Sequence, residues 1–316
     1  MRSTAVEHVI ELPVLGHRTR FETNDPCVGA LVDEAFGGWR CLPDVEPDGA
    51  TPLTVRVVVH EGSEHTDGPV PVRHVCPDAT RVIAHSPGSF AISDPLRREA
   101  IVHVSTTLLG DRAHFRDTML DAITLALLSH FDRHPLHAAA VGCDGRAILL
   151  AGPSGSGKST LAYAARAAGL DVLGEDHVWV QTTPQLRVWG WPATTFRLLP
   201  EAASQFPELV VQTHVNDARR GKRLVDPGDG RRRAAPIADA AVVCVLARGT
   251  GAASLERLSP GEVAEALGRD VDPGFDRFPA RHADVVRTLA APGGWRLRLS
   301  SDPRAAIACL LRVLDA

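Results

Sequence analysis

The chain has 316 residues, of which 44% are hydrophobic and 23% are charged, and its formal net charge at pH 7 is -4. These values are ordinary for a globular protein and exclude the basic balance by which many proteins bind nucleic acid. No apolar run approaches the length that spans a bilayer, so we expect neither a membrane nor a nucleic acid as partner.

The beginning of the chain and its cysteines predict a cytoplasmic protein. Residues 1–13 contain acidic side chains and lack the apolar core of a secretory signal peptide. The six cysteines are scattered and follow no spacing typical of a zinc site or of a disulfide framework. We therefore expect reduced thiols.

Residues 1–110 are expected to form a smaller, separate α/β domain of unknown role. Short segments rich in β-branched residues alternate there with proline and glycine turns, and residues 28–36 favour a helix. The predicted strands cover residues 9–12, 53–60, 81–84, 89–93 and 100–104. The segment shows no catalytic pattern, and holding a substrate and forming a homo-oligomer both stay open as its role.

A helix over residues 114–131 is expected at the start of the second domain, residues 111–316, where it joins the two domains. Its apolar side chains recur every four residues and so share one face: Phe115, Met119, Ile123, Leu127 and Phe131. Such a stripe predicts a face packed on a core. A strand is expected next, over residues 136–141, and it contains His137, which taken alone is typical of a structural histidine.

An Asp-Gly turn leads from there into an apolar strand over 147–151 and then into the sequence GPSGSGKS, residues 152–159, here called the phosphate loop. It matches the pattern G-x-x-x-x-G-K-[ST], and a helix predicted over 160–168 places it between a strand and a helix, as phosphate binding requires. Lys158 is expected to reach the β- and γ-phosphates, and the Ser159 hydroxyl to bind Mg2+. The predicted nucleotide contacts are Gly152, Ser154, Gly155, Ser156, Gly157, Lys158, Ser159 and Thr160.

Two adjacent acids, Glu175 and Asp176, follow the strand predicted over residues 171–174. Acids that follow a phosphate-loop helix in this way recur in phosphoryl-transfer sites. One of them can bind Mg2+, and the other can accept the proton of an attacking hydroxyl. A polar turn between two strands is the alternative interpretation.

A long basic segment, residues 216–233, interrupts the strands and helices that follow. Arg219, Lys222 and Arg223 are its candidate phosphate or substrate contacts, and a solvated insertion is the other interpretation. The strands expected around it cover residues 177–181, 185–190, 239–247 and 295–300. The expected helices cover residues 201–209, a segment that begins at Pro260, residues 280–290 and a last segment that ends at 314.

The order of these features resembles the catalytic domain of bacterial HPr kinase/phosphorylase, a serine kinase. The resemblance covers residues 137–180 and extends weakly to 247. It implies a P-loop kinase core with a mixed sheet and flanking helices, and ATP and Mg2+ as cofactors. The site residues that it implies are Lys158 and Ser159 at the phosphates, Ser159 and Glu175 at the metal, Asp176 as the base and His137 beside it.

The chain departs from that family at three points. Its first acid is Glu175, where the family usually has Asp, and residues 188–192 lack the acid that the family carries on a following strand. The C-terminal signature of the carrier-protein reaction is also not evident. The chain is more similar to divergent relatives found beside peptide natural-product genes, including those of lasso peptides, which phosphorylate a serine of the precursor peptide.

The sequence thus predicts an ATP- and Mg2+-dependent kinase that phosphorylates an alcohol, with serine of a peptide or small protein as the first choice of acceptor. Three alternatives stay open. One is a kinase for a small-molecule alcohol such as a metabolite, free serine or a natural product, and another is a nucleotide-binding regulator without transfer activity. The third is an ordinary ATPase or GTPase, for which Asp239 is the candidate distal acid.

Overall fold

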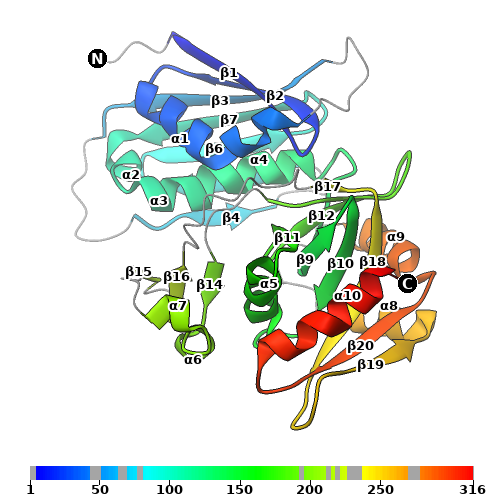
Figure 1. Ribbon diagram of the computed structural model, residues 1–316. Coiled ribbons are helices and arrows are strands. Elements are labelled where there is room, and N and C mark those ends of the chain that lie inside the picture. The colour runs from blue at the N-terminus through cyan, green and yellow to red at the C-terminus, as the bar shows by residue number, and fades with distance from the viewer. Residues whose placement is uncertain are drawn as a thin grey trace. The chain divides into compact units, whose positions relative to one another are not determined.

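The computed structural model describes residues 5–42, 51–62, 70–76, 81–191, 196–210, 215–217, 221–225, 237–269 and 278–315 (Figure 1). The chain divides into two units, Met1–Arg133 and His134–Ala316. Each unit combines β-sheet with helices, so the expectation of an α/β protein is confirmed. No helix among the described residues is long and apolar enough to cross a membrane.

Within the described part of the first unit, seven strands form one mixed sheet. Its strand order is β1-β2-β3-β7-β6-β5-β4, with β3 parallel to both of its neighbours and the other pairs antiparallel. The strands are β1 (His8–Val14), β2 (His17–Thr23), β3 (Leu53–His60), β4 (Arg73–Val75), β5 (Val82–Ser86), β6 (Ser89–Asp94) and β7 (Glu99–Ser105). The prediction missed β2, because its sequence HRTRFET offers Phe21 as its one large apolar side chain, and also β4, which has three residues.

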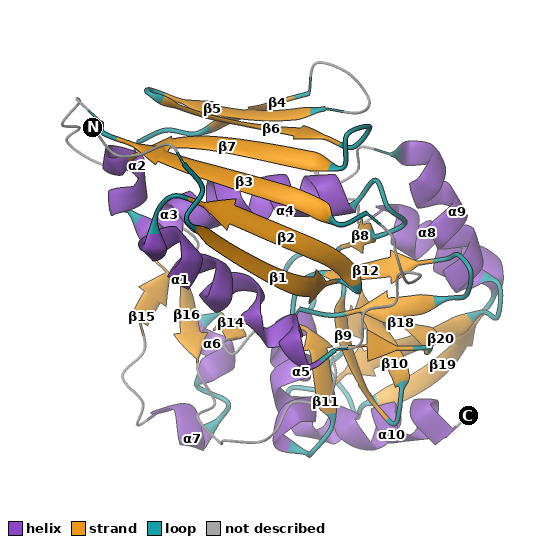
Figure 2. Ribbon diagram, turned by 90° about the horizontal axis from the view of Figure 1, so that it is seen from above, coloured by secondary structure: helices purple, strands orange, loops and turns teal. Residues whose placement is uncertain are grey.

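The helices of the first unit pack on this sheet, and in Figure 2 helix α4 passes behind its strands. They are α1 (Pro26–Phe36), the 3-10 segment η1 (Gly37–Cys41), α2 (Thr106–Gly110), α3 (Arg112–Phe115), the π-helical segment η2 (Arg116–Leu120) and α4 (Asp121–Leu128). Alternate residues of β3 (Leu53, Val55, Val57 and Val59) are buried, as a half-covered sheet requires.

The predicted apolar stripe is confirmed as a core face, since Phe115, Met119, Ile123 and Leu127 are fully buried. Helix α4 packs on β5, β6 and β7, all strands of the first sheet. The helix therefore belongs to the first unit, and the chain divides after Arg133 instead of at the boundary expected near residue 110. The stripe predicted a buried face correctly but did not say which sheet would bury it.

The described residues of the second unit contain a six-stranded sheet, here called the central sheet. Its order is β11-β9-β10-β18-β20-β19. Strands β10, β18 and β20 are parallel, while β9 is antiparallel to both β10 and β11, so β11 runs in the direction of β10. The strands are β9 (Ala139–Cys143), β10 (Arg146–Ala151), β11 (Asp171–Gly174), β18 (Ala240–Arg248), β19 (Ser254–Leu258) and β20 (Gly294–Leu299). The C-terminal ends of β10, β11, β18 and β20 therefore share one edge, here called the loop edge.

Strand β10 is buried on both faces, which explains its continuous apolar sequence. Ile148 and Leu150 join a core with helices α5 (Lys158–Ala167) and α10 (Ile307–Asp315). Ala147 and Leu149 join a second core with α8 (Pro260–Arg269) and α9 (Pro279–Ala290). The expectation of a mixed sheet with flanking helices is confirmed at this level.

Two smaller sheets complete the described part of the second unit, in the orders β17-β13-β12-β8 and β14-β16-β15. Their strands are β8 (His134–Leu136), β12 (Val178–Gln181), β13 (Arg187–Trp189), β14 (Phe196–Leu198), β15 (Val215–Asp217), β16 (Lys222–Val225) and β17 (Ile237–Ala238). The short elements α6 (Pro200–Ala203), α7 (Pro207–Val210) and η3 (Pro303–Ala306) lie between strands and helices of this unit.

Three predictions differ from these elements. The helix expected over 201–209 is broken into α6 and α7, because Pro207 has no N–H to continue the first helix. The strand expected over 136–141 is interrupted between β8 and β9, so His137 lies in the gap. The basic segment 216–233 contains β16, and its residues 218–220 and 226–233 lie outside the described residues. Strand β19 was not predicted.

Candidate functional site

The phosphate loop connects β10 at the loop edge to the N-terminus of α5. Gly152, Gly155 and Gly157 have φ values of 145°, 80° and 107°, a backbone conformation that L side chains rarely adopt. A Cβ at Gly157 would also lie 3.0 Å from Leu299 Cδ1. The Ser156 N–H donates to the Pro153 carbonyl over 3.0 Å and closes the turn. The glycines at these positions therefore allow the loop its shape.

The polar groups of the loop fit an anion. Lys158 is 6% exposed, and its Nζ donates to the Gly152 carbonyl and, over 3.5 Å, to the Pro153 carbonyl. The Ser156 side chain is 8% exposed, and its Oγ has no hydrogen-bond partner among the described residues. A phosphate oxygen would satisfy that buried hydroxyl and accept from the ammonium group, beside the positive end of the α5 dipole.

Asp176 lies between two histidines. Its Oδ1 is 3.4 Å from Nε2 of His137, and its Oδ2 is 3.3 Å from Nδ1 of His177. The two imidazole rings stack with centroids 5.3 Å apart and an interplanar angle of 23°. The interruption between β8 and β9 places His137 there, while Asp176 and His177 follow the C-terminal end of β11.

A cavity of about 730 Å³ joins these groups. Of the predicted site residues, it is lined by His137, Asp176 and the loop residues Ser154, Gly155, Ser156, Gly157, Lys158, Ser159 and Thr160. The structure therefore brings the candidate base, the supporting histidine and the phosphate loop to one hollow. Ser159, the predicted magnesium ligand, lines the same cavity as Asp176.

Glu175, the other predicted metal ligand, does not line this cavity. Its side chain is 9% exposed, and its Oε2 accepts a hydrogen bond of 2.9 Å from the backbone N–H of Arg197. The carboxylate thus connects the end of β11 to β14. Among the described residues, no group of three His, Cys, Asp or Glu side chains is arranged to hold a metal ion.

Of the three candidate contacts in the basic segment, the structure describes the side chain of one, Arg223. Arg219 lies outside the described residues, and the side chain of Lys222, the first residue of β16, is not described. Arg223 is half-buried on β16 and does not line the cavity. The candidate phosphate contacts of this segment therefore stay predictions for Arg219 and Lys222, whereas Arg223 lies elsewhere.

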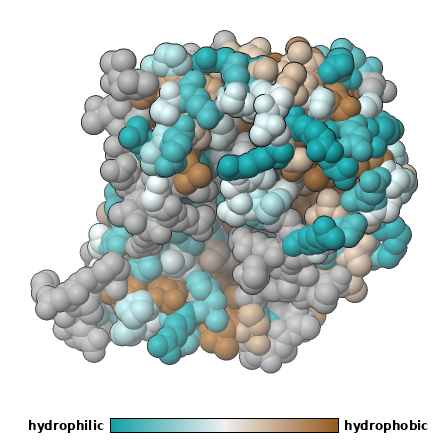
Figure 3. Space-filling view, turned by 90° about the horizontal axis from the view of Figure 1, so that it is seen from below, coloured by the Kyte–Doolittle hydropathy of each residue, from teal (hydrophilic) through white to brown (hydrophobic). Residues whose placement is uncertain are grey.

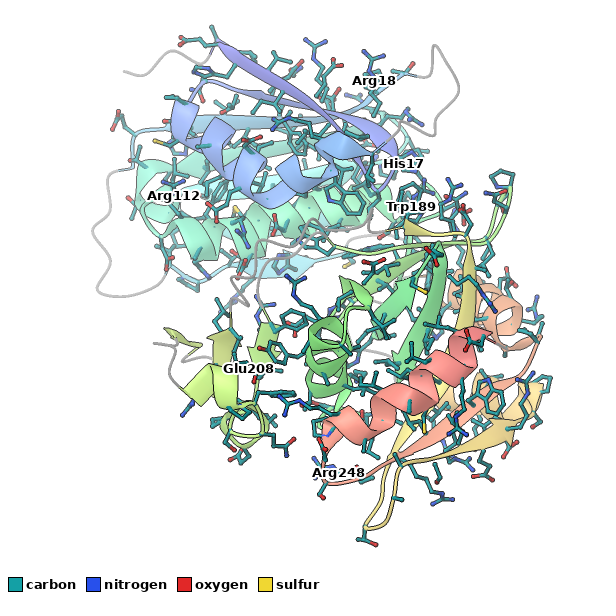
Figure 4. All side chains as sticks on the ribbon, viewed as in Figure 1. His17, Arg18, Arg112, Trp189, Glu208 and Arg248 are labelled. Carbon is teal, nitrogen blue, oxygen red and sulfur yellow. The ribbon has the colours of Figure 1, made fainter. Side chains whose placement is uncertain are left out.

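Two other arginines that the sequence analysis did not select do line the cavity, Arg197 on β14 and Arg248 at the end of β18. Arg248 is labelled in Figure 4. Arg248 Nη2 donates to the Gly155 carbonyl over 2.7 Å. The sequence does place Arg248 directly after a predicted apolar strand. That position indicates a site residue only when β18 is known to pair in parallel with β10. His177 was missed as well, although it follows the two acids in the sequence.

Asp239, the acid on which the ATPase alternative depended, lies away from the loop edge. It immediately precedes β18, whose first residue Ala240 pairs with Arg146 at the start of β10. Asp239 Oδ1 is bound there by Arg187 Nε over 2.6 Å. Because the phosphate loop follows the other end of β10, this carboxylate is not a distal acid of the site.

No protein-family model matches the chain, and no curated protein matches it significantly. The resemblance to HPr kinase/phosphorylase therefore stays a prediction from residues 137–180.

On the face displayed in Figure 3, hydrophilic residues are interspersed with smaller apolar areas.

Proposed function

We propose that this protein is an ATP- and Mg2+-dependent kinase that transfers the γ-phosphate to an alcohol, with serine of a peptide or small protein as the first choice of acceptor. One observation carries the proposal: Asp176, held between two histidines, lines the same cavity as Lys158 and Ser159 of a glycine-bearing phosphate loop. A glycine turn without a nucleotide would not need a base, a buried lysine and an unsatisfied buried hydroxyl around one hollow.

Asp176 is assigned the role of general base. The acceptor oxygen attacks the γ-phosphorus, its proton passes to the carboxylate of Asp176, and the bond from the γ-phosphorus to the β–γ bridging oxygen breaks, which leaves ADP. His137 and His177 are positioning residues, because each approaches a different oxygen of that carboxylate. Their stacked rings limit its rotation and so favour one orientation toward the acceptor.

The phosphate loop is assigned the role of stabilising the negative charge of the transferred phosphate. Lys158 and the backbone N–H groups at the start of α5 face the transferred charge in a preorganised arrangement. Mg2+ is commonly bound to nucleotides through one or two protein oxygens, with phosphate oxygens and water completing its shell. Ser159 offers such an oxygen at the cavity, and a bound Mg2+ would offset negative charge on the phosphates.

A nucleotide-binding regulator without transfer activity is the second candidate, and the position of Glu175 favours it. In a kinase with two acids at the metal, both carboxylates would face the phosphates, but Glu175 faces the Arg197 backbone. A small-molecule kinase differs from the proposal only in the acceptor, which the experiment below separates.

The test is transfer of radiolabelled phosphate from γ-labelled ATP by the full chain with Mg2+, against serine-containing peptides, free serine, sugars and hydroxylated natural products. Label on a peptide supports the proposal, and label only on a small molecule supports the small-molecule alternative. Lys158→Ala and Asp176→Asn should abolish transfer. Asp171→Asn is the matched control, because Asp171 begins β11 at the opposite end from the loop edge. Nucleotide binding without any transfer would support the regulator.

A further inference from the structure

A second cation contacts the phosphate loop. Arg248 ends β18, lines the cavity, and uses one N–H of its guanidinium to donate to the Gly155 carbonyl over 2.7 Å. A guanidinium group has five N–H donors in a planar fork. One bond to a loop carbonyl therefore places the group beside the phosphate loop, from where it can shift onto a ligand in the cavity.

The order of the central sheet places this cation opposite the candidate base. Strand β11 lies on one side of β10 and β18 lies on the other, while the C-terminal ends of all three share the loop edge. Asp176, which follows β11, and Arg248, which ends β18, therefore approach the phosphate loop from opposite sides. Both line the same cavity.

This arrangement gives a bound nucleotide a direction. The acceptor hydroxyl must lie beside Asp176 and in line with the γ-phosphate. The γ-phosphate then lies toward β11, and the phosphates nearer the nucleoside lie toward β18. The side of the cavity at the ends of β18 and β20 is lined by Arg248, Gly249, Leu299, Ser300 and Ser301.

We propose that Arg248 binds the α- and β-phosphates of the nucleotide and moves onto them from the Gly155 carbonyl. The inference rests on the proposed function for the direction of the nucleotide. A carbonyl oxygen is a weaker acceptor than an ionised phosphate oxygen, so the guanidinium gains a charge-assisted, bidentate partner when it shifts. Arg248 thereby binds substrate ATP and product ADP through the same two phosphates. Such uniform binding lowers KM for ATP without raising kcat.

The experiment is calorimetric titration of the full chain with Mg2+-ADP, Mg2+-ATP and adenosine. Arg248→Ala should weaken ADP and ATP alike by about tenfold to a hundredfold, the range expected for hydrogen bonds to a charged group. Adenosine binding should not change. Arg248→Lys keeps the charge but loses the fork and should recover part of the affinity. Arg298→Ala is the matched control, because Arg298 is an exposed arginine on β20 that pairs with Glu256 and does not line the cavity. It should bind as the wild type does.

Three results overturn the inference. If Arg248→Ala leaves the ADP affinity unchanged, Arg248 does not contact the phosphates. If only the ATP affinity falls, Arg248 contacts the γ-phosphate, and if the adenosine affinity falls equally, it contacts the nucleoside. Thermal unfolding of each variant checks that the fold is retained. If the wild type binds ADP but transfers no phosphate, the proposed kinase function is refuted, while the titrations still test the role of Arg248. If the wild type binds no nucleotide, the proposed function and the role of Arg248 are both refuted.

Discussion

Nε2 of His137 lies 3.4 Å from Oδ1 of Asp176, although the two residues belong to segments on either side of the phosphate loop and its helix. The contact exists because β9 lies between β10 and β11 in the central sheet. His137 precedes β9 and Asp176 follows β11, and these antiparallel strands bring the two ends to the same place. His177 approaches the other carboxylate oxygen.

Removal of either histidine should slow phosphate transfer while nucleotide binding is retained. We expect His137→Asn and His177→Asn each to lower kcat by about tenfold to a hundredfold, because the Asp176 carboxylate loses a group that orients it. The KM for ATP should change little, since neither histidine belongs to the phosphate loop. Steady-state kinetics with the acceptor that the labelling experiment finds measures both constants. His282→Asn, on α9 and away from the cavity, is the control. A rise in the KM for ATP with an unchanged kcat would contradict the positioning role.

Substitution of Glu175 should affect stability more than chemistry. In Glu175→Ala the part-buried backbone N–H of Arg197 loses the acceptor that it now has at 2.9 Å, and the loss of a hydrogen bond to a charged group costs about 1.5–3 kcal/mol of unfolding free energy. Glu175→Gln keeps an acceptor oxygen and should retain transfer activity.

The control for this prediction is Glu208→Ala, labelled in Figure 4, whose exposed carboxylate pairs with Arg304 at 3.2 Å. An exposed ion pair contributes about 0–1 kcal/mol, so this variant should unfold nearly as the wild type does. Urea unfolding measures both effects. Complete loss of transfer in Glu175→Gln with normal stability would restore the sequence-based assignment of Glu175 as a metal ligand.

Asp121 should make the first unit less stable as the pH rises. Burial raises the pKa of its carboxyl to about 7, even though Arg116 lies 3.5 Å away. The folded state therefore keeps a proton that the unfolded state releases near pH 4, so the unfolding free energy falls between about pH 4 and pH 7 and levels off above that range. The loss is at most about 4 kcal/mol, at about 1.4 kcal/mol for each unit of pKa difference.

Asparagine does not titrate, so the Asp121→Asn variant lacks this pH dependence. The stability of the variant relative to the wild type should therefore be higher at pH 8 than at pH 5. Chemical unfolding at the two pH values measures the difference. Asp33→Asn is the control, since Asp33 is a half-exposed acid on α1. An equal wild-type-to-variant difference at both pH values would show that Asp121 is ionised in the folded protein.

Gly157→Ala should damage the phosphate loop through its backbone. A φ of 107° is strained for alanine by about 1–2 kcal/mol, and the added Cβ would meet Leu299 Cδ1 at 3.0 Å. Nucleotide affinity and thermal stability should both fall. Gly268→Ala is a matched comparison, because Gly268 lies within α8 with open space around it. That substitution should stabilise the protein by about 0.5–1 kcal/mol. Equal behaviour of the two variants in calorimetry would refute the assigned backbone role.

Local patterns predicted much of the fold. The apolar run of β10 and the helix formers of α5 specify a strand, a loop and a helix over adjacent residues, and these elements form where they were expected. Elements without a strong local pattern were missed or were assigned to the wrong part of the fold. Strand β2 is mostly polar, and β19 has two adjacent charged residues between its two leucines. The apolar helix ending at Leu128 could not reveal which sheet it covers.

By itself, the sequence determined the phosphate loop and the candidate base, because a glycine turn, a lysine and adjacent acids act through neighbouring residues. It did not determine which side chains from distant segments would meet them. The tertiary structure decided that Arg248 contacts the loop, that Glu175 turns toward Arg197, and that Asp239 lies at the far end of β18. The physical reason is that strand order and direction set these distances, and pairing between strands depends on the packing of the whole sheet.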